Sequence, residues 1–263
     1  MGVMSGSFAT YFYIYYLGRG FMVEILQDRV PYDFSAKKPL PGLSPLAPDG
    51  WIIEDEAFAA QMAERDRLIF EIPEKVFCDA GASLDAKIEV LDQILHLLRG
   101  RSNYKISHTH VIRPDGITVK LDGDPLLTAA RLVQEDLCLH EKSGDEHILT
   151  AGVLCFPASW TLSEKVGRPL SAVHGPVVEY DENIAKRVQR LFDGIQSGRP
   201  VWRFNLLQYV SSELYQPRYE ADARRIDQDY GSGEYTRTEH QSLVRMPKTG
   251  AVLFSIHTYV IKT

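Results

Sequence analysis

Charged and amide side chains alternate with other residues along two C-terminal stretches that are expected to form strands. The odd positions of 237–245 are Arg237, Glu239, Gln241, Leu243 and Arg245, and those of 201–209 are Val201, Arg203, Asn205, Leu207 and Tyr209. Because successive side chains on a strand point to opposite faces, each set lies along one side of its strand. If both strands belong to one sheet, the Arg, Glu, Gln and Asn side chains converge on one face and could line a functional pocket. A solvated face is the alternative interpretation.

A second candidate is His174, which stands in the run AVHGPV. Proline fixes its own φ and restricts the residue before it, so this histidine adjoins backbone with little freedom. A metal centre needs an imidazole that is held in one direction. A turn residue without any chemical role is the other interpretation of the same run.

Other polar groups are weaker candidates. His108 and His110 would share one face of a strand, but no carboxylate or cysteine partner is evident nearby, so we expect an exposed polar edge. Three residues are expected in solvent because they flank a turn: His140, Glu141 and His147. Glu135 and Asp136 begin a strand and could act as general acid or base. Dinucleotide, P-loop, esterase-elbow and zinc-protease motifs are all missing from the sequence.

The composition is that of an ordinary globular chain of 263 residues, with 44% apolar and 24% charged residues. The net charge of −6 and the lack of a basic tract argue against nucleic acid as a partner. The three cysteines, Cys78, Cys138 and Cys155, form no CxxC pair, which favours free thiols in a reducing cytoplasm. The apolar run 8–17 is too short to span a bilayer, so no membrane association is expected.

Periodicity and turn residues predict the elements that position these groups. A proline-rich extended lead-in over 28–50 precedes helices at 54–69, 84–98 and 125–133. Ser83 is expected to cap the second helix, with an apolar stripe of Ile88, Leu91, Leu95 and Leu98, and Asp124 to cap the third.

The pattern then changes to strands, predicted at 133–141, 147–156, 201–210, 236–246 and 251–261, with a helix at 182–196 between them. This order predicts an α+β fold. We expect residues 1–27 to form an N-terminal extension and 28–263 a single domain, with a helical lead-in over 50–133 and a sheet-rich core over 133–263. The charged stretch 218–234 is expected to be a mobile loop.

Several long runs resemble the alpha subunit of the haem-dependent oxidative N-demethylase family. They are LVQEDLCL (132–139), GVLCFPASWTLSEKVGRPLSAVHGPV (152–177), VWRFN (201–205), RTEHQSLVRMPKTGAVLFSIHTYV (237–260) and the lead-in GLSPLAPDGWI (42–52). They occur in the family's order and cover nearly everything from about residue 30 to the end.

The resemblance implies a PAS-like antiparallel sheet with flanking helices and an N-terminal helical extension, holding haem b in its pocket. It also implies dioxygen-dependent removal of a methyl group from a small secondary amine, such as dimethylamine, to give a primary amine and formaldehyde. Electrons would come from NADPH through a separate flavin and iron–sulfur reductase subunit, and folate chemistry on another subunit would take up the one-carbon product.

Carried onto this sequence, the resemblance makes His174 the proximal haem ligand. Arg203 and Asn205 would lie on the dioxygen side, and Glu239 and Gln241 would hold a protonated amine. The candidates for pairing with the haem propionates are Lys165, Arg168, Arg245 and Lys248. The family more usually has tryptophan where this chain has Leu206, which affects the expected amine more than the haem.

Two other functions are compatible with the same residues. A PAS-like haem protein could sense gas or redox state without turnover, and a haem-free member could retain only the scaffold. Self-association into a homo-oligomer is also left open by the sequence.

Overall fold

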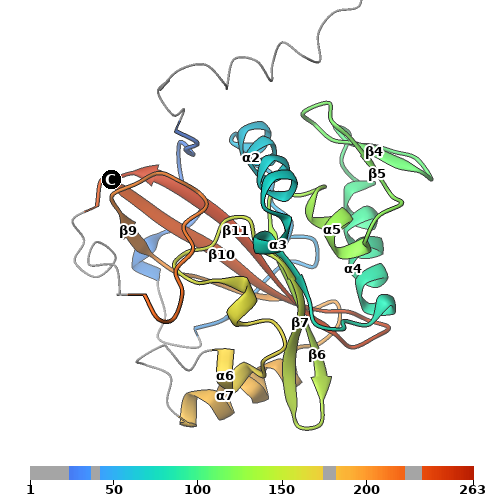
Figure 1. Ribbon diagram of the computed structural model, residues 1–263, viewed down its shortest axis with the longest axis vertical. Helices are drawn as coiled ribbons and strands as arrows, with labels where there is room; N and C mark the ends of the chain where they lie inside the picture. Colours follow the sequence, from blue (N-terminus) through green and yellow to red (C-terminus); the bar gives the residue numbers. More distant parts are fainter. Residues whose placement is uncertain (1–23, 37–41, 174–181, 223–232) are drawn as a thin grey trace, which may run out of the picture.

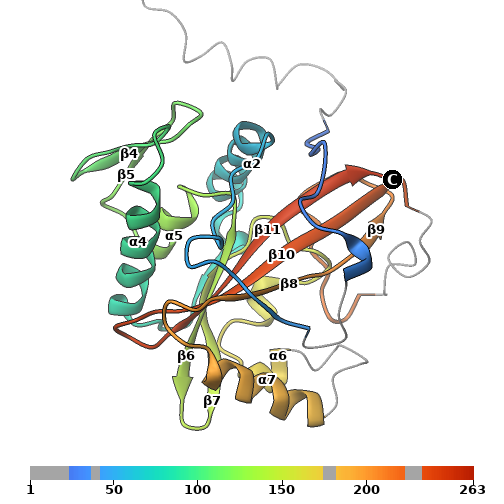
Figure 2. The same ribbon diagram turned by 180° about the vertical axis from the view of Figure 1, so that it is seen from behind.

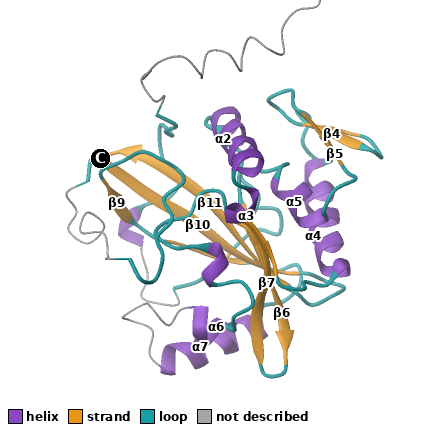
Figure 3. Cartoon of the chain, in the orientation of Figure 1, coloured by secondary structure: helices purple, strands orange, loops and turns teal. Residues whose placement is uncertain are grey.

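A computed structural model describes residues 24–36, 42–173, 182–222 and 233–263 (Figure 1). His174 and most of the charged loop 218–234 therefore lie outside the described residues. The chain forms helices around a long twisted antiparallel sheet (Figure 3), which confirms the α+β prediction.

The main sheet has eight strands in the described residues. Its order is β1 (Ser44–Pro45), β8 (Val201–Phe204), β10 (Tyr235–Arg245), β11 (Val252–Lys262), β6 (Asp136–Ser143), β7 (Glu146–Val153) and β2 (Phe77–Asp79), and β9 (Leu207–Tyr209) also pairs with β10. A second sheet, which the sequence did not predict, contains β3 (Lys105–Ile106), β4 (His110–Ile112) and β5 (Thr118–Lys120).

The longer helices follow their sequence signals closely. They are α2 (Phe58–Glu71), α4 (Leu84–Leu98), α5 (Pro125–Ala130) and α7 (Glu182–Gly194), and the short ones are η1 (Phe34–Ala36), α3 (Pro73–Val76), η2 (Leu162–Glu164) and α6 (Leu170–Val173). The Ser83 hydroxyl accepts from the Ala86 N–H at 3.2 Å, and Asp124 accepts from two N–H groups of α5, so both predicted caps are confirmed.

Several predicted details were wrong, including the following three. The stretch 201–210 is two strands, β8 and β9, separated at Asn205 and Leu206. The first helix begins at Phe58 rather than at residue 54. Ile88 is 40% exposed, because α4 turns Val90 and Ile94 into the core instead.

Side chains of β10 alternate between two faces, which are covered by different helices. The α7 face carries Arg237, Glu239, Gln241 and Leu243, and Leu243 packs with Phe192 of α7. The α2 face carries Thr238, His240, Ser242 and Val244, and Val244 belongs to the core that also contains Phe58 and Met62 of α2. Figures 1 and 2 show α6 and α7 beside the β6–β7 hairpin, with α2, α4 and α5 grouped above them.

The segment before the sheet is part of this structure. The backbone N–H of Gln27 donates to the Val260 carbonyl at 2.9 Å, and the Gln27 side chain is buried. The Tyr32 ring stacks on the Phe204 ring of β8, with 4.6 Å between the ring centroids. In the part of the chain that the structure describes, no helix is long and apolar enough to cross a membrane.

A buried ionic group joins the residues just before α2 to the sheet. The His257 ring lies between two carboxylates, with Nδ1 3.1 Å from Glu135 and Nε2 3.0 Å from Asp55. Burial lowers the pKa of His257, but hydrogen bonds and charge from the two carboxylates outweigh it and raise that pKa to about 9. A histidinium here neutralises two carboxylates that burial would otherwise penalise.

His257→Gln should destabilise the fold by about 3 kcal/mol at pH 6.5, since it leaves the two carboxylates without a compensating cation. A histidine whose pKa is raised stabilises the folded state below its unfolded pKa, near 6.5, and loses that contribution as the pH rises through about 9. Urea unfolding between pH 6 and 9.5 should therefore show a falling stability in the wild type and a flatter curve in the variant. Equal slopes would contradict the charged state of His257.

Candidate functional site

The α7 face gathers four residues that the sequence singled out. Gln241 is directly opposite Arg203 in the β8–β10 register. The Asn205 N–H donates to the Glu239 carbonyl at 3.3 Å, which places this pair beside the first. Arg203, Asn205, Glu239 and Gln241 thus form one group, which we name the polar cluster.

Hydrogen bonds inside the polar cluster hold the Glu239 carboxyl in one orientation. The Asn205 Nδ2 donates to Glu239 Oε2 at 2.7 Å, and the Gln241 Nε2 donates to the same oxygen at 2.9 Å. Asn205 Oδ1 in turn accepts the backbone N–H of Glu239 at 2.7 Å. The other carboxyl oxygen, Oε1, is buried and has no hydrogen-bond partner among the described residues.

The environment of Glu239 favours its neutral form. Its side chain is only 3% exposed, and burial raises its pKa although the charge of Arg237 acts in the opposite direction. Arg237 does not reach the carboxyl, since its guanidinium donates to the carbonyls of Phe156, Glu213 and Leu214. Glu239 is therefore a buried carboxyl with a free oxygen, which is a common property of functional acids.

Arg203 is the cation of the polar cluster. Its side chain is half-buried, and it forms no hydrogen bond or ion pair with the described residues. Burial lowers its pKa, and the charge of Glu239 only partly offsets this effect. An arginine in such surroundings can bind an anion or a polarised oxygen.

An apolar wall continues the α7 face beyond the polar cluster. Ile256, opposite Gln241 in the register, packs with Cys138, Leu149, Leu154 and Leu162. Trp160, Val166, Val173 and Phe254 pack against this group. Val173 is the last described residue before His174, which lies outside the described residues.

Two of the predicted propionate partners lie near the end of α6. Lys165 Nζ donates to the Val173 carbonyl at 2.8 Å and to Glu220 at 2.6 Å. Arg168 lies 3.3 Å from the same carboxylate. Both cations therefore have a protein carboxylate as partner, and Lys165 also contacts Val173, the last described residue before His174.

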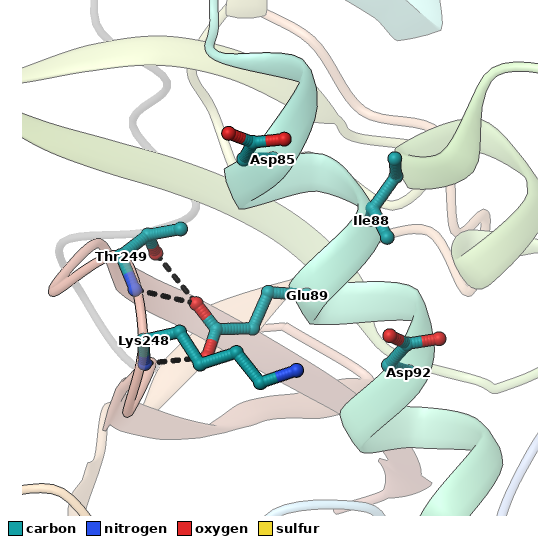
Figure 4. Close-up of a pocket in the computed structure, with 6 residues that line it drawn as sticks. All are labelled: Asp85, Ile88, Glu89, Asp92, Lys248 and Thr249. Carbon is teal, nitrogen blue, oxygen red and sulfur yellow. Dashed lines mark hydrogen bonds between the residues drawn. The ribbon is translucent and has the colours of Figure 1, made fainter.

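The other two predicted partners lie elsewhere. Arg245 ends β10, about 20 Å along the strand from Glu239, and its guanidinium donates to the carbonyls of Phe192, Ile195 and Gly250. Lys248 lies beyond it in the β10–β11 turn, where its backbone N–H and that of Thr249 bind Glu89 of α4 (Figure 4). The structure therefore does not bring Arg245 and Lys248 to the polar cluster.

The weaker candidates also have structural contacts. His140 and His147 are buried rather than solvated, because both rings pack against Phe192 of α7. Asp136 pairs with the buried Arg65 at 2.9 Å. No group of three or more possible metal ligands occurs within the described ranges.

Sequence reasoning missed Thr258, which is directly opposite Glu239 in the β10–β11 register. Its side chain is fully buried, and its Oγ1 has no partner among the described residues. The hairpin turn at 247–250 could have indicated this register, because a tight turn fixes which residues pair across it.

One comparison with known proteins bears on this site. Residues 42–263 match the model of the family described as haem-dependent oxidative N-demethylase, alpha subunit-like. The chain belongs to this family, as its sequence motifs indicated. The family description implies haem dependence and a partner subunit.

Glu239→Gln should stabilise the protein by about 1 kcal/mol at pH 8, because it removes a buried carboxylate with a free oxygen. A carboxyl with a raised pKa costs stability only above its unfolded pKa, so the difference from wild type should shrink toward pH 4.5. Urea unfolding at both pH values measures this difference, with the exposed Glu213→Gln as control. A variant less stable than wild type at pH 8 would contradict it.

Proposed function

We propose that this member of the family removes a methyl group oxidatively from a small secondary amine, with haem b, dioxygen and electrons from a partner reductase. The amine nitrogen keeps one methyl group, and the other leaves as formaldehyde. One oxygen atom of dioxygen enters the aldehyde and the other leaves as water, with two electrons supplied from NADPH through a flavin and iron–sulfur partner. The observation that carries this proposal is the polar cluster beside an apolar wall, in which Glu239 Oε1 and the Arg203 guanidinium have no partner among the described residues.

The sheet supports a PAS-like assignment of the domain. Numbered along the chain, its five main strands β6, β7, β8, β10 and β11 follow the order 2-1-5-4-3 when the sheet is read from β7 to β8. The helices η2, α6 and α7 stand between the second and third of these strands. This strand order and the position of the helices support the proposal that the domain is PAS-like and that its ligand lies against one face of the sheet.

We place the haem against the α7 face because of the kinds of residue found there. The apolar wall supplies nonpolar side chains of the kind that contact a macrocycle, and Arg203, on the far side of Gln241, is a half-buried cation without a partner among the described residues. His174 is proposed as the iron ligand. Lys165, which contacts Val173, and Arg168, which shares the Glu220 carboxylate with it, are proposed as partners of the propionates. When bound, haem b supplies the iron at which dioxygen is activated.

Each member of the polar cluster has a proposed task. Glu239 Oε1 accepts an N–H of the amine, and Gln241 and Asn205 hold the carboxyl through Oε2. Arg203 stabilises negative charge that develops on oxygen near the same face. Because burial raises the pKa of Glu239, its carboxyl is protonated more readily than an exposed one. When a protonated amine binds, Glu239 releases its proton to solvent, and the resulting carboxylate–ammonium pair buries no net charge.

His174→Ala should abolish or strongly shift the Soret band of the purified protein, since the variant lacks the proposed ligand nitrogen. His96→Ala, which changes an exposed histidine of α4, serves as the control and should leave the spectrum unchanged. An unaltered Soret band in His174→Ala would remove His174 from the ligand position.

Amine affinity should increase with pH up to the raised pKa of Glu239 and then become constant. Below that pKa the free amine and Glu239 each carry a proton, whereas the bound pair shares one, so binding releases a proton and tightens up to tenfold per pH unit. Calorimetric titration with dimethylamine at several pH values measures the slope, and Glu239→Gln should remove it.

Formaldehyde release with a supplied reductase separates the enzyme from a haem sensor, because a sensor is expected to release no formaldehyde.

A further inference from the structure

Thr258 lies directly opposite Glu239 across the β10–β11 pair, so its buried side chain projects from the same face of the sheet. Residues directly opposite each other in an antiparallel pair project from the same face with Cβ atoms about 5 Å apart. Thr258 Oγ1 and Glu239 Oε1 are both buried, and neither has a hydrogen-bond partner among the described residues. Most buried polar side-chain atoms in folded proteins have a partner, so two neighbouring exceptions indicate a ligand that supplies two donors.

The protein holds both atoms in place. Asn205 and Gln241 fix the carboxyl of Glu239 through Oε2. On the opposite face, Gln27 and Gln61 donate to the Thr258 carbonyl at 3.1 and 3.0 Å, which fixes the backbone that carries the hydroxyl. A β-branched side chain adds a stiff χ1, so the hydroxyl has little freedom to turn away. Two oxygens held rigidly in this way form a preorganised pair of acceptors.

We propose that Thr258 is a specificity-determining residue whose hydroxyl accepts the second N–H of a secondary ammonium while Glu239 accepts the first. This assignment rests on the proposed function. A secondary ammonium has two N–H donors, a tertiary ammonium has one, and a quaternary ammonium has none. Thr258 therefore distinguishes amines by their remaining hydrogens, because a tertiary amine leaves its hydroxyl without a partner and places a methyl group against it.

The test measures binding of dimethylamine and trimethylamine to the haem-loaded protein by calorimetry. Thr258→Val, which has nearly the same shape but no hydroxyl, should weaken dimethylamine binding about tenfold and change trimethylamine binding less than about twofold. Thr258→Ser should keep most of the dimethylamine affinity. Thr128→Val, a buried threonine of α5, is the matched control and should bind both amines like the wild type.

The stability of Thr258→Val separates a binding role of Thr258 from a purely structural one. Without amine, this variant should be at least as stable as the wild type, because it removes a buried hydroxyl that lacks a partner. A clear loss of stability, or an equal loss of affinity for both amines, would overturn the assignment.

Two further results separate this inference from the proposed function. If Glu239→Gln abolishes dimethylamine binding while Thr258→Val leaves it intact, only the assignment of Thr258 fails. If neither change affects binding, the amine site itself is misplaced and the proposed function fails with it. If Thr258→Val does not fold, the wild type provides the test. Equal affinity for the two amines would overturn selectivity at Thr258, and a tenfold preference for dimethylamine would support it.

Discussion

The antiparallel pairing of β10 with β11 is the constraint on which the rest of the structure depends. The register runs without a shift from Tyr235 opposite Lys262 to Arg245 opposite Val252. Because side chains alternate along both strands, this single register assigns every polar residue of the hairpin to one of two faces. A slip by one residue would exchange the two faces, so that His257 would meet the apolar wall and Glu239 would meet the core beneath α2.

The two faces treat buried carboxyl groups in opposite ways. On the α2 face, Glu135 and Asp55 share the ring of His257, which makes that group a structural connection between the residues just before α2 and the sheet. On the α7 face, Glu239 keeps one oxygen free and has no cation within hydrogen-bonding reach among the described residues. Burial of a carboxyl without full compensation is unfavourable, so its retention beside Arg203 is better explained by ligand binding than by stability.

The sequence predicted elements with a local cause and missed features that depend on tertiary contacts. Ser83 and Asp124 act as caps through atoms two or three residues away, and alternation alone was enough to group Glu239 with Gln241. By contrast, the exposure of Ile88 depends on how α4 rotates against the core, and the burial of His140 depends on Phe192 of a distant helix. Thr258 carries no signal of its own, since a threonine in a strand becomes informative only when its partner across the sheet is known.

The interruption between β8 and β9 explains how Asn205 comes to serve Glu239. Phe204 is opposite His240 and Leu207 is opposite Arg237, so the register is maintained across the two residues that leave the strand. Side chains replace the missing ladder bonds there, because Asn205 Oδ1 accepts the Glu239 N–H and the Thr238 hydroxyl donates to the Asn205 carbonyl. The side-chain amide of Asn205 thus replaces a backbone hydrogen bond of the sheet and also binds the Glu239 carboxyl. An Asn205→Ala chain would lose both contacts together, which ties the shape of the polar cluster to the integrity of the sheet edge.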